Sequence, residues 1–121
     1  MVVDAIHHDQ LREHGGLPGI RDEKLLESAL ARAKQKWHDA ERTDLPTLAA
    51  AYAFGLVTNH PYRDGNKRIG FLAMVTFLGI NGHDYEAEEA EIVAEFLALA
   101  NGRISEEALA DWIRPRSSKN R

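Results

Sequence analysis

Residues 60–68 read His-Pro-Tyr-Arg-Asp-Gly-Asn-Lys-Arg, and they separate two of the most apolar segments of the chain. Residues 48–57 precede this stretch and residues 69–80 follow it, and both segments are apolar nearly all round a helix. Each is too long for an ordinary strand, so we expect two buried helices of one core. The polar stretch between them, called the motif loop below, is therefore where that core reaches water.

The composition of the motif loop suits a phosphate group. A turn that contains Pro61 and Gly65 leads directly into the second helix, whose first N–H groups lack partners within the helix and attract anions. Arg63, Lys67 and Arg68 add positive charge, arginine as a fork that matches phosphate and lysine as a point charge. The sequence therefore predicts an anion site at the start of this helix.

Two further residues of the motif loop indicate a reaction rather than simple binding. Asp64 would repel a bare phosphate, but a Mg²⁺ ion held between the carboxylate and nucleotide phosphates removes that conflict. His60 offers a neutral imidazole, the commonest group for taking a proton from a hydroxyl near neutral pH. The motif loop thus predicts transfer of a phosphorus-containing group from a nucleotide to a hydroxyl.

Length and composition narrow the class of protein. The 121 residues are enough for one domain with its own core, and the absence of cysteine means that nothing depends on an oxidising compartment. A net charge of −4 argues against direct nucleic-acid binding. We see neither a secretory leader nor a membrane span, and therefore expect a cytoplasmic protein that does not enter a membrane.

Capping residues predict an all-α, compact single-domain bundle of about six helices. Asp22, Asp44 and Ser105 are typical N-caps, and only two or three residues near Tyr85 resemble a strand. The first expected helix covers residues 4–14, and the second starts at residue 23 and continues into the segment 33–43, where a loop follows. The other four are expected from 45 to about 60, and at 66–80, 88–100 and 106–113.

The domain is expected to cover residues 1–113, and the polar, basic tail of residues 114–121 is expected to be disordered. In the fifth helix we expect Val93 and Leu97 to point inward with Ile92, Phe96 and Leu99. The acidic start of that helix has two interpretations, a metal or partner site and a solvated face, and the helix dipole favours the second.

Three histidines near the N-terminus, His7, His8 and His14, invite a zinc-site interpretation. The adjacent pair points to different faces of the expected helix, and neither a thiol nor a Glu-x-x-His partner accompanies them. We therefore favour surface or capping histidines over a metal site.

At the motif loop the sequence resembles the Fic/Doc family, whose signature reads roughly H-P-F-x-D/N-G/A-N-K/G-R. Lys67 stands where Fic adenylyltransferases have a second glycine, so the match is stronger for the Doc (death on curing) branch. Tyr62 adds a hydroxyl to the expected anchoring ring, and Gly65 is the Fic-like choice at its position. The resemblance covers roughly residues 4–113 and implies the Fic/Doc fold.

The resemblance to the Doc branch implies transfer of the γ-phosphate of ATP to a protein hydroxyl, by an enzyme without a kinase fold. His60 would activate the hydroxyl, Asp64 would hold Mg²⁺, and both would count as catalytic together with Lys67 and Arg68. The implied phosphate-binding residues are Gly65, Asn66, Lys67 and Arg68. Each also has a plain structural interpretation as a cap, a turn or a solvated charge, but their joint occurrence in family order favours function.

The resemblance further implies a toxin that acts on a Ser/Thr hydroxyl of elongation factor Tu and so stops translation. Many Fic proteins carry an inhibitory helix with the pattern S/T-x-x-x-E-G/N, which this sequence lacks. We therefore expect a separate Phd-type antitoxin that folds onto the toxin, with DNA association only through that partner. Two alternatives stay open: AMP transfer of the Fic type, which Gly65 allows, and a non-catalytic antitoxin-binding corepressor.

Overall fold

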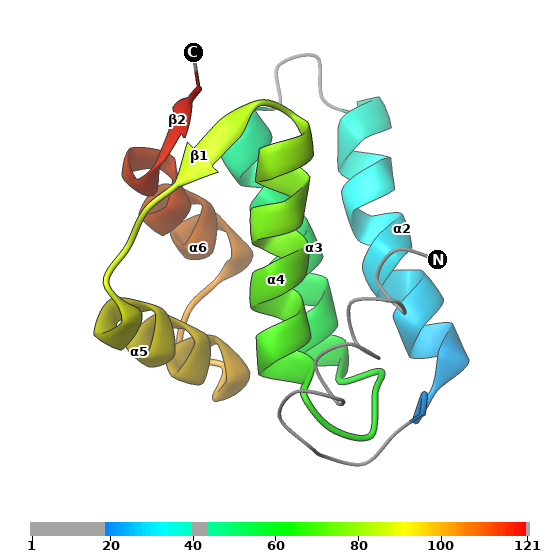
Figure 1. Cartoon of the computed structure of the whole chain (residues 1–121). Coiled ribbons are helices and arrows are strands. Elements are labelled where there is room, and N and C mark those ends of the chain that lie inside the picture. Colours follow the sequence, from blue (N-terminus) through cyan, green and yellow to red (C-terminus); the bar gives the residue numbers. More distant parts are fainter. Residues whose placement is uncertain (1–18, 40–43, 121) are drawn as a thin grey trace.

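The computed structural model describes residues 19–39 and 44–120, and in these ranges the chain is all-α apart from a small two-stranded sheet (Figure 1). The predicted fold class is confirmed. These ranges contain five α-helices rather than about six, and the helix expected over residues 4–14 lies outside them. The helices are α2 (Glu23–Asp39), α3 (Leu45–Asn59), α4 (Asn66–Ile80), α5 (Glu89–Ala100) and α6 (Glu106–Ile113).

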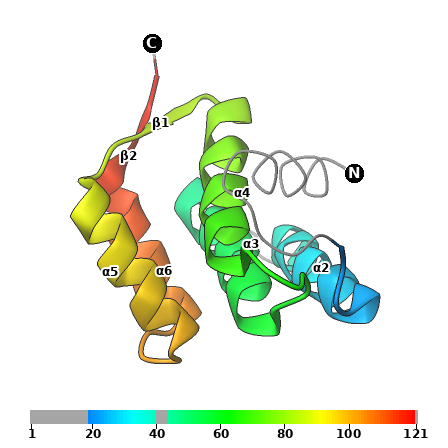
Figure 2. The same ribbon diagram turned by 60° about the horizontal axis from the view of Figure 1, so that its bottom comes forward.

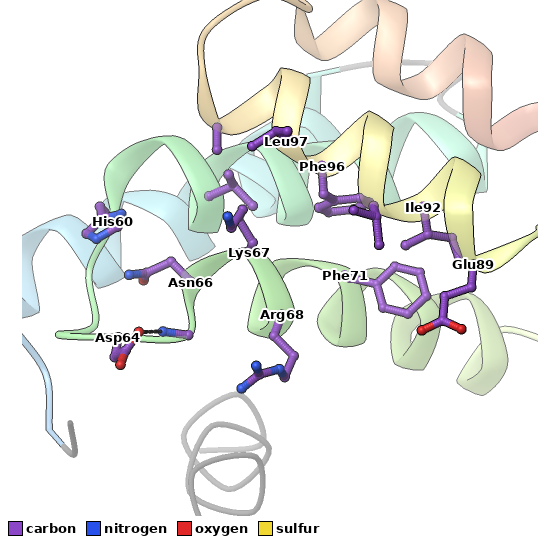
Figure 3. A pocket seen from close by; sticks show the side chains of 14 residues that line it. His60, Asp64, Asn66, Lys67, Arg68, Phe71, Glu89, Ile92, Phe96 and Leu97 are labelled. Carbon is purple, nitrogen blue, oxygen red and sulfur yellow. Dashed lines mark hydrogen bonds between the residues drawn. The ribbon is translucent and has the colours of Figure 1, made fainter. Parts of the chain in front are cut away.

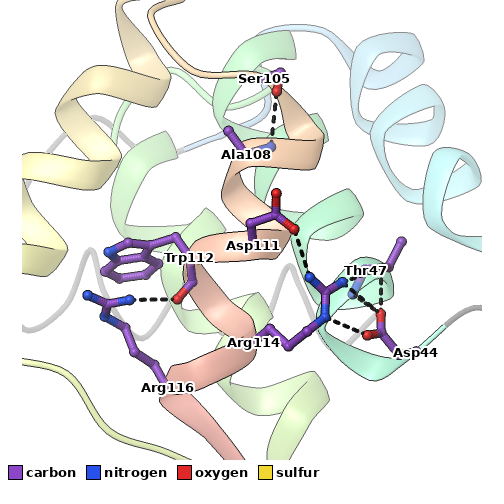
Figure 4. Close-up of polar contacts among 8 residues, drawn as sticks. All are labelled: Asp44, Thr47, Ser105, Ala108, Asp111, Trp112, Arg114 and Arg116. Carbon is purple, nitrogen blue, oxygen red and sulfur yellow. Dashed lines mark hydrogen bonds and ion pairs between the residues drawn. The ribbon is translucent and has the colours of Figure 1, made fainter.

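Local capping explains where three of these helices begin. Asp22, Asp44 and Ser105 each accept a hydrogen bond from the backbone N–H three residues later, at 3.1, 3.0 and 3.0 Å. All three predicted N-caps are thereby confirmed (the Ser105 cap is drawn in Figure 4). None of the helices in residues 19–39 and 44–120 combines the length and the hydrophobicity needed to cross a bilayer.

Helix α3 is the centre of the fold, with α2 on one side and the pair α5 and α6 on the other, while α4 packs along it (Figures 1 and 2). Its small residues are buried, including the fully buried run Ala49, Ala50 and Ala51. A helix with such short side chains lets its neighbours approach closely on every side. The two apolar helices on either side of the motif loop are therefore core helices, as predicted.

Two glycines bring the helices together near the motif loop. A Cβ atom on Gly55 of α3 would lie 3.0 Å from the Cα of Ala29 in α2. A Cβ atom on Gly70 of α4 would lie 2.6 Å from Cγ2 of Val57 in α3. Real Cβ atoms essentially never lie as close as 2.6 Å to another atom, so the observed packing requires glycine at position 70, whereas a Cβ atom at Gly55 would require Ala29 to shift slightly.

The C-terminal tail differs from the expected disorder. After α6 it forms a short 3₁₀ helix, η1 (Arg114–Arg116), and then β2 (Ser117–Lys119), which pairs antiparallel with β1 (His83–Tyr85). Arg116 donates to Glu91 Oε2 at 3.0 and 2.8 Å and lies 4.6 Å from the ring centre of Trp112. These long-range contacts give the polar tail a place to bind, so it is ordered through residue 120.

Helix α5 also differs from the prediction in one respect. Phe96 and Leu99 are buried as expected, and Ile92 is partly buried against the same core. Val93 and Leu97 are 60% and 48% exposed, so the inward orientation predicted for them is wrong. They lie one helical turn apart and form an apolar surface that the core does not cover.

Candidate active site

His60 is the first residue of the motif loop, and its backbone is unusual. It caps the C-terminal end of α3 with φ 54° and ψ 51°, the left-handed region. Among the described residues it is the one non-glycine residue with positive φ. Since this conformation costs an L-residue about 1–2 kcal/mol, the surrounding structure must hold it. The result is an exposed imidazole at the point where the buried helix ends.

Buried residues anchor the rest of the motif loop. The predicted anchoring ring of Tyr62 is confirmed, because only 1% of this residue is exposed. The side chain of Asn66, itself buried, accepts from the N–H of Tyr62 at 3.0 Å and donates to its carbonyl at 2.9 Å. These two hydrogen bonds connect the start of α4 to the middle of the motif loop. The buried side chain of Asn66 thus serves the loop, and the contribution to a ligand that we expect from Asn66 is its backbone N–H.

The first turn of α4 presents its N–H groups to the loop side. Gly65 is the N-cap in a left-handed conformation (φ 77°, ψ 17°), and no side chain caps this helix. The first helical hydrogen bond runs from the N–H of Ile69 to the carbonyl of Gly65 at 2.9 Å. The three N–H groups before Ile69 therefore have no partner within the helix, which makes this helix start, called the anion-binding terminus below, a candidate site for an anion.

A pocket of about 750 Å³ lies between the motif loop and α5 (Figure 3). The predicted site residues line one end of it: His60, Asp64, Gly65, Asn66, Lys67 and Arg68. Figure 3 shows Lys67 extending from α4 toward α5, whereas Arg68 points to the other side of α4. The volume is within the range of about 300–1,000 Å³ that is typical of small-molecule sites.

The other end of the pocket is largely apolar, apart from Glu89 of α5, and was missed by sequence reasoning. Its lining includes Phe71 of α4 and, from α5, Ile92, Val93, Phe96, Leu97 and Ala100. The rings of Phe71 and Phe96 meet edge to face at a centroid distance of 5.6 Å. Apolar residues in α5 cover a wider arc than one core stripe needs, and this signal could have indicated a second apolar surface.

Tyr85 packs behind Phe71, and its burial shifts the pKa of its side chain. The ring of Tyr85 packs against Phe71 at a centroid distance of 5.8 Å, and burial raises the pKa of its phenol. A phenol is neutral at physiological pH even at its ordinary pKa, so this shift leaves the charge of the wall unchanged.

Asp64 is the carboxylate closest in sequence to the anion-binding terminus. One of its oxygens accepts from the N–H of Gly65 at 2.8 Å. The described residues contain no cluster of three or more His, Cys, Asp or Glu side chains suited to a metal ion. A single carboxylate fits Mg²⁺ when nucleotide phosphates and water supply the remaining oxygens, which is the usual arrangement for this ion.

Comparison with known proteins agrees with this geometry. The profile of the Fic/DOC family matches residues 2–78, which contain the whole motif loop. The chain belongs to the Fic/Doc family. It is 30% identical over 110 residues to the protein kinase doc of Escherichia phage P1, covering 91% of this chain and 86% of that protein. It is also 38% identical over 84 residues to the toxin Doc of Mycolicibacterium smegmatis, covering 64% and 63% of the two chains.

Proposed function

We propose that this chain is the toxin of a toxin–antitoxin pair and transfers the γ-phosphate of ATP to a Ser/Thr hydroxyl of a translation factor. One observation carries the proposal: an exposed imidazole at the end of α3 and the uncapped start of α4 line one pocket. A base for the acceptor and an anion site for the donor are thus both available within that pocket.

In the proposed reaction His60 takes the proton from the acceptor hydroxyl, and the oxygen then forms a bond to the γ-phosphorus. The bond from that phosphorus to the β,γ-bridging oxygen breaks, so ADP leaves and a phosphoprotein remains. The proton on His60 passes to solvent, which restores the base. Backbone N–H groups of α4 and the charge of Lys67 stabilise the negative charge on the phosphate oxygens.

Asp64 would hold Mg²⁺, which when bound neutralises part of the charge on the phosphates. The apolar end of the pocket gives the bound molecule a surface that excludes water, because Phe71 and Phe96 present their rings there. An adenine base or an apolar side chain beside the acceptor hydroxyl fits this part of the pocket.

The donor end supports γ- over α-phosphate transfer through Lys67. Its side chain extends over the space between α4 and α5 (Figure 3), where a glycine would leave the backbone open to a phosphate. A relative named as a protein kinase, 30% identical to this chain, supports the same choice. The alternative, AMP transfer, is supported by Gly65, which has the left-handed backbone and is the residue found in Fic-type enzymes.

The proposed target is elongation factor Tu, and the proposed inhibitor is a Phd-type antitoxin that also provides any link to DNA. A relative named as a toxin supports an antitoxin partner, whereas the factor and the type of antitoxin are those that the resemblance to the Doc branch implies. The absence of an inhibitory S/T-x-x-x-E-G/N pattern in the sequence supports control by a separate chain.

The test is a transfer assay with purified protein, Mg²⁺, elongation factor Tu and ATP labelled at either the α- or the γ-position. We expect γ-label on the protein acceptor and no α-label, with transfer lost in His60→Ala. Asp64→Asn should weaken transfer in a way that added Mg²⁺ partly restores, because the carboxylate is the proposed metal ligand.

Each other outcome changes the assignment. Transfer of α-label would move the chain to the adenylylating branch of the family. An active His60→Ala variant would remove the proposed base. No label from either position, together with unchanged toxicity of His60→Ala in growing bacteria, would support the non-catalytic corepressor.

A further inference from the structure

Residues 19–22 lie beside the motif loop and hold its first part in place. Ile20 and Tyr62 form an isolated antiparallel β-bridge. The N–H of Arg21 donates to the carbonyl of Pro61 at 2.7 Å. The segment before α2 therefore forms one side of the loop that carries the proposed base.

The side chain of Arg21 makes a more specific contact. Its Nε donates to the carbonyl of His60 at 2.8 Å, and its Nη2 donates to the carbonyl of Asn59 at 3.1 Å. Carbonyls at the end of a helix lack partners within it, so the guanidinium satisfies two of them at once. A planar fork can reach two adjacent acceptors in this way, whereas an ammonium group acts from a single point.

These bonds are made where the backbone needs support. Left-handed conformation at a non-glycine residue is unfavourable, and His60 adopts it at the last turn of α3. If His60 continued the helix instead, its side chain would follow the surface of α3. Bonding its carbonyl to a fixed partner favours the turned peptide, and the turned peptide directs the imidazole to the pocket that His60 lines.

We propose that Arg21 is a positioning residue for His60. The guanidinium holds the peptides on both sides of the His60 Cα and so keeps the imidazole in its productive orientation. Arg21 is not among the residues that line the pocket, so it acts through His60 and not on ATP or the acceptor. This inference rests on the proposed function, because it takes His60 to be the base.

The first test measures phosphate transfer by Arg21→Gln and Arg21→Lys. We expect kcat to fall about 10–100-fold in Arg21→Gln, because a misplacement of about 1 Å costs catalysis on this scale. The KM for ATP should stay within about twofold, since the anion site on α4 is untouched. The lysine of Arg21→Lys can still reach one carbonyl, so the kcat of this variant should lie between that of the parent and that of Arg21→Gln.

Arg114→Gln is the matched control. Arg114 binds the other end of α3 through Asp44 at 2.8 Å and lies far from the motif loop in sequence and in contacts. Both arginine variants should melt at a somewhat lower temperature than the parent. Only the Arg21 variants should lose kcat when all are assayed well below their melting temperatures.

A double variant keeps the test informative even if Arg21→Gln is less stable. Residual transfer by His60→Ala, with or without added imidazole as a replacement base, no longer depends on how His60 is oriented. Adding Arg21→Gln should therefore change that residual rate less than about twofold, although it lowers kcat strongly when His60 is present.

The outcomes separate this inference from the function on which it rests. If His60→Ala is inactive while Arg21→Gln keeps the parent kcat, Arg21 has no positioning role and the proposed function stands. Equal losses from Arg21→Gln with and without His60 would also overturn the inference, because Arg21 would then act elsewhere. A His60→Ala variant that keeps the parent kcat overturns the proposed function itself.

Discussion

An arginine from a distant part of the chain reaches each end of α3, but the backbone differs at the two ends. At the start, Asp44 is extended (φ −80°, ψ 163°) and accepts from Arg114 at 2.8 Å (Figure 4). The hydrogen bond from Arg114 lowers the pKa of Asp44 to about 2. At the other end, Arg21 donates to the carbonyl of a left-handed His60.

The difference teaches how one residue type can serve two purposes in a small domain. Asp44 itself has an extended backbone that any residue adopts and caps α3 with its side chain, so the arginine adds to a helix start that is already well formed. Around His60 the arginine stabilises a conformation that costs free energy, and the residue in that conformation lines the pocket. The Asp44 end of α3 adds stability, whereas the His60 end costs stability and places the imidazole at the pocket.

The largest effect that would sharpen this comparison comes from replacing His60 itself. His60→Ala and His60→Gly should both lower kcat by about 10²–10⁴-fold, as expected for loss of a general base. They should differ in stability: His60→Gly should be about 1 kcal/mol more stable than His60→Ala, since glycine accepts positive φ at little cost. Urea denaturation measures this. Equal stability of the two variants would mean that the left-handed backbone is not strained.

The next effect concerns the close packing of α4 on the last turns of α3. Gly70→Ala places a methyl group 2.6 Å from Cγ2 of Val57, so we expect a loss of about 1–3 kcal/mol in the free energy of unfolding. Gly79→Ala, in the same helix, meets nothing within 4 Å and should be neutral or stabilising by about 0.5–1 kcal/mol. Thermal unfolding of the two variants tests the opposite signs, and a Gly70→Ala variant as stable as the parent would contradict the packing.

The smallest effect is at the other end of α3 and depends on pH. The pKa of Asp44 lies below its ordinary 3.8 in the folded chain, so its stabilising contribution is complete above that value and is lost as the pH falls toward about 2. Both partners are nearly half exposed, with side-chain values of 45% for Arg114 and 47% for Asp44. We therefore expect only about 0.5–1 kcal/mol.

Urea denaturation of Arg114→Gln between pH 7 and pH 3 measures this contribution. The deficit against the parent should shrink as the pH falls, while kcat at neutral pH stays that of the parent. Arg103→Gln is a suitable control, because the described residues include no ion-pair partner for Arg103. A deficit that grows toward low pH would contradict the proposed linkage.

Much of the fold was predictable because its signals are local. The caps Asp22, Asp44 and Ser105 act on N–H groups three residues away, so sequence spacing alone reveals them. The motif loop was equally readable, since its polar residues follow one another between two apolar helices. Six of its nine residues line one pocket, and their catalytic roles stay predictions.

What sequence reasoning missed depends on contacts between distant segments. Arg21 reaches a carbonyl 39 residues away, and nothing in its neighbourhood marks it as a partner of His60. Val93 and Leu97 look like core positions until the placement of α5 leaves them open to the pocket. Asn66 was predicted to bind phosphate, whereas the structure commits its side chain to Tyr62.

The sequence by itself thus determined the helices, their caps and the chemical groups of the motif loop, because these rest on interactions within three or four residues. Only the tertiary structure decided how the base is held, which wall completes the pocket, and how the tail is ordered. Those features depend on which helices pack together and how closely. Small residues such as Gly70 permit close packing, but no local sequence pattern shows which segment will be the neighbour.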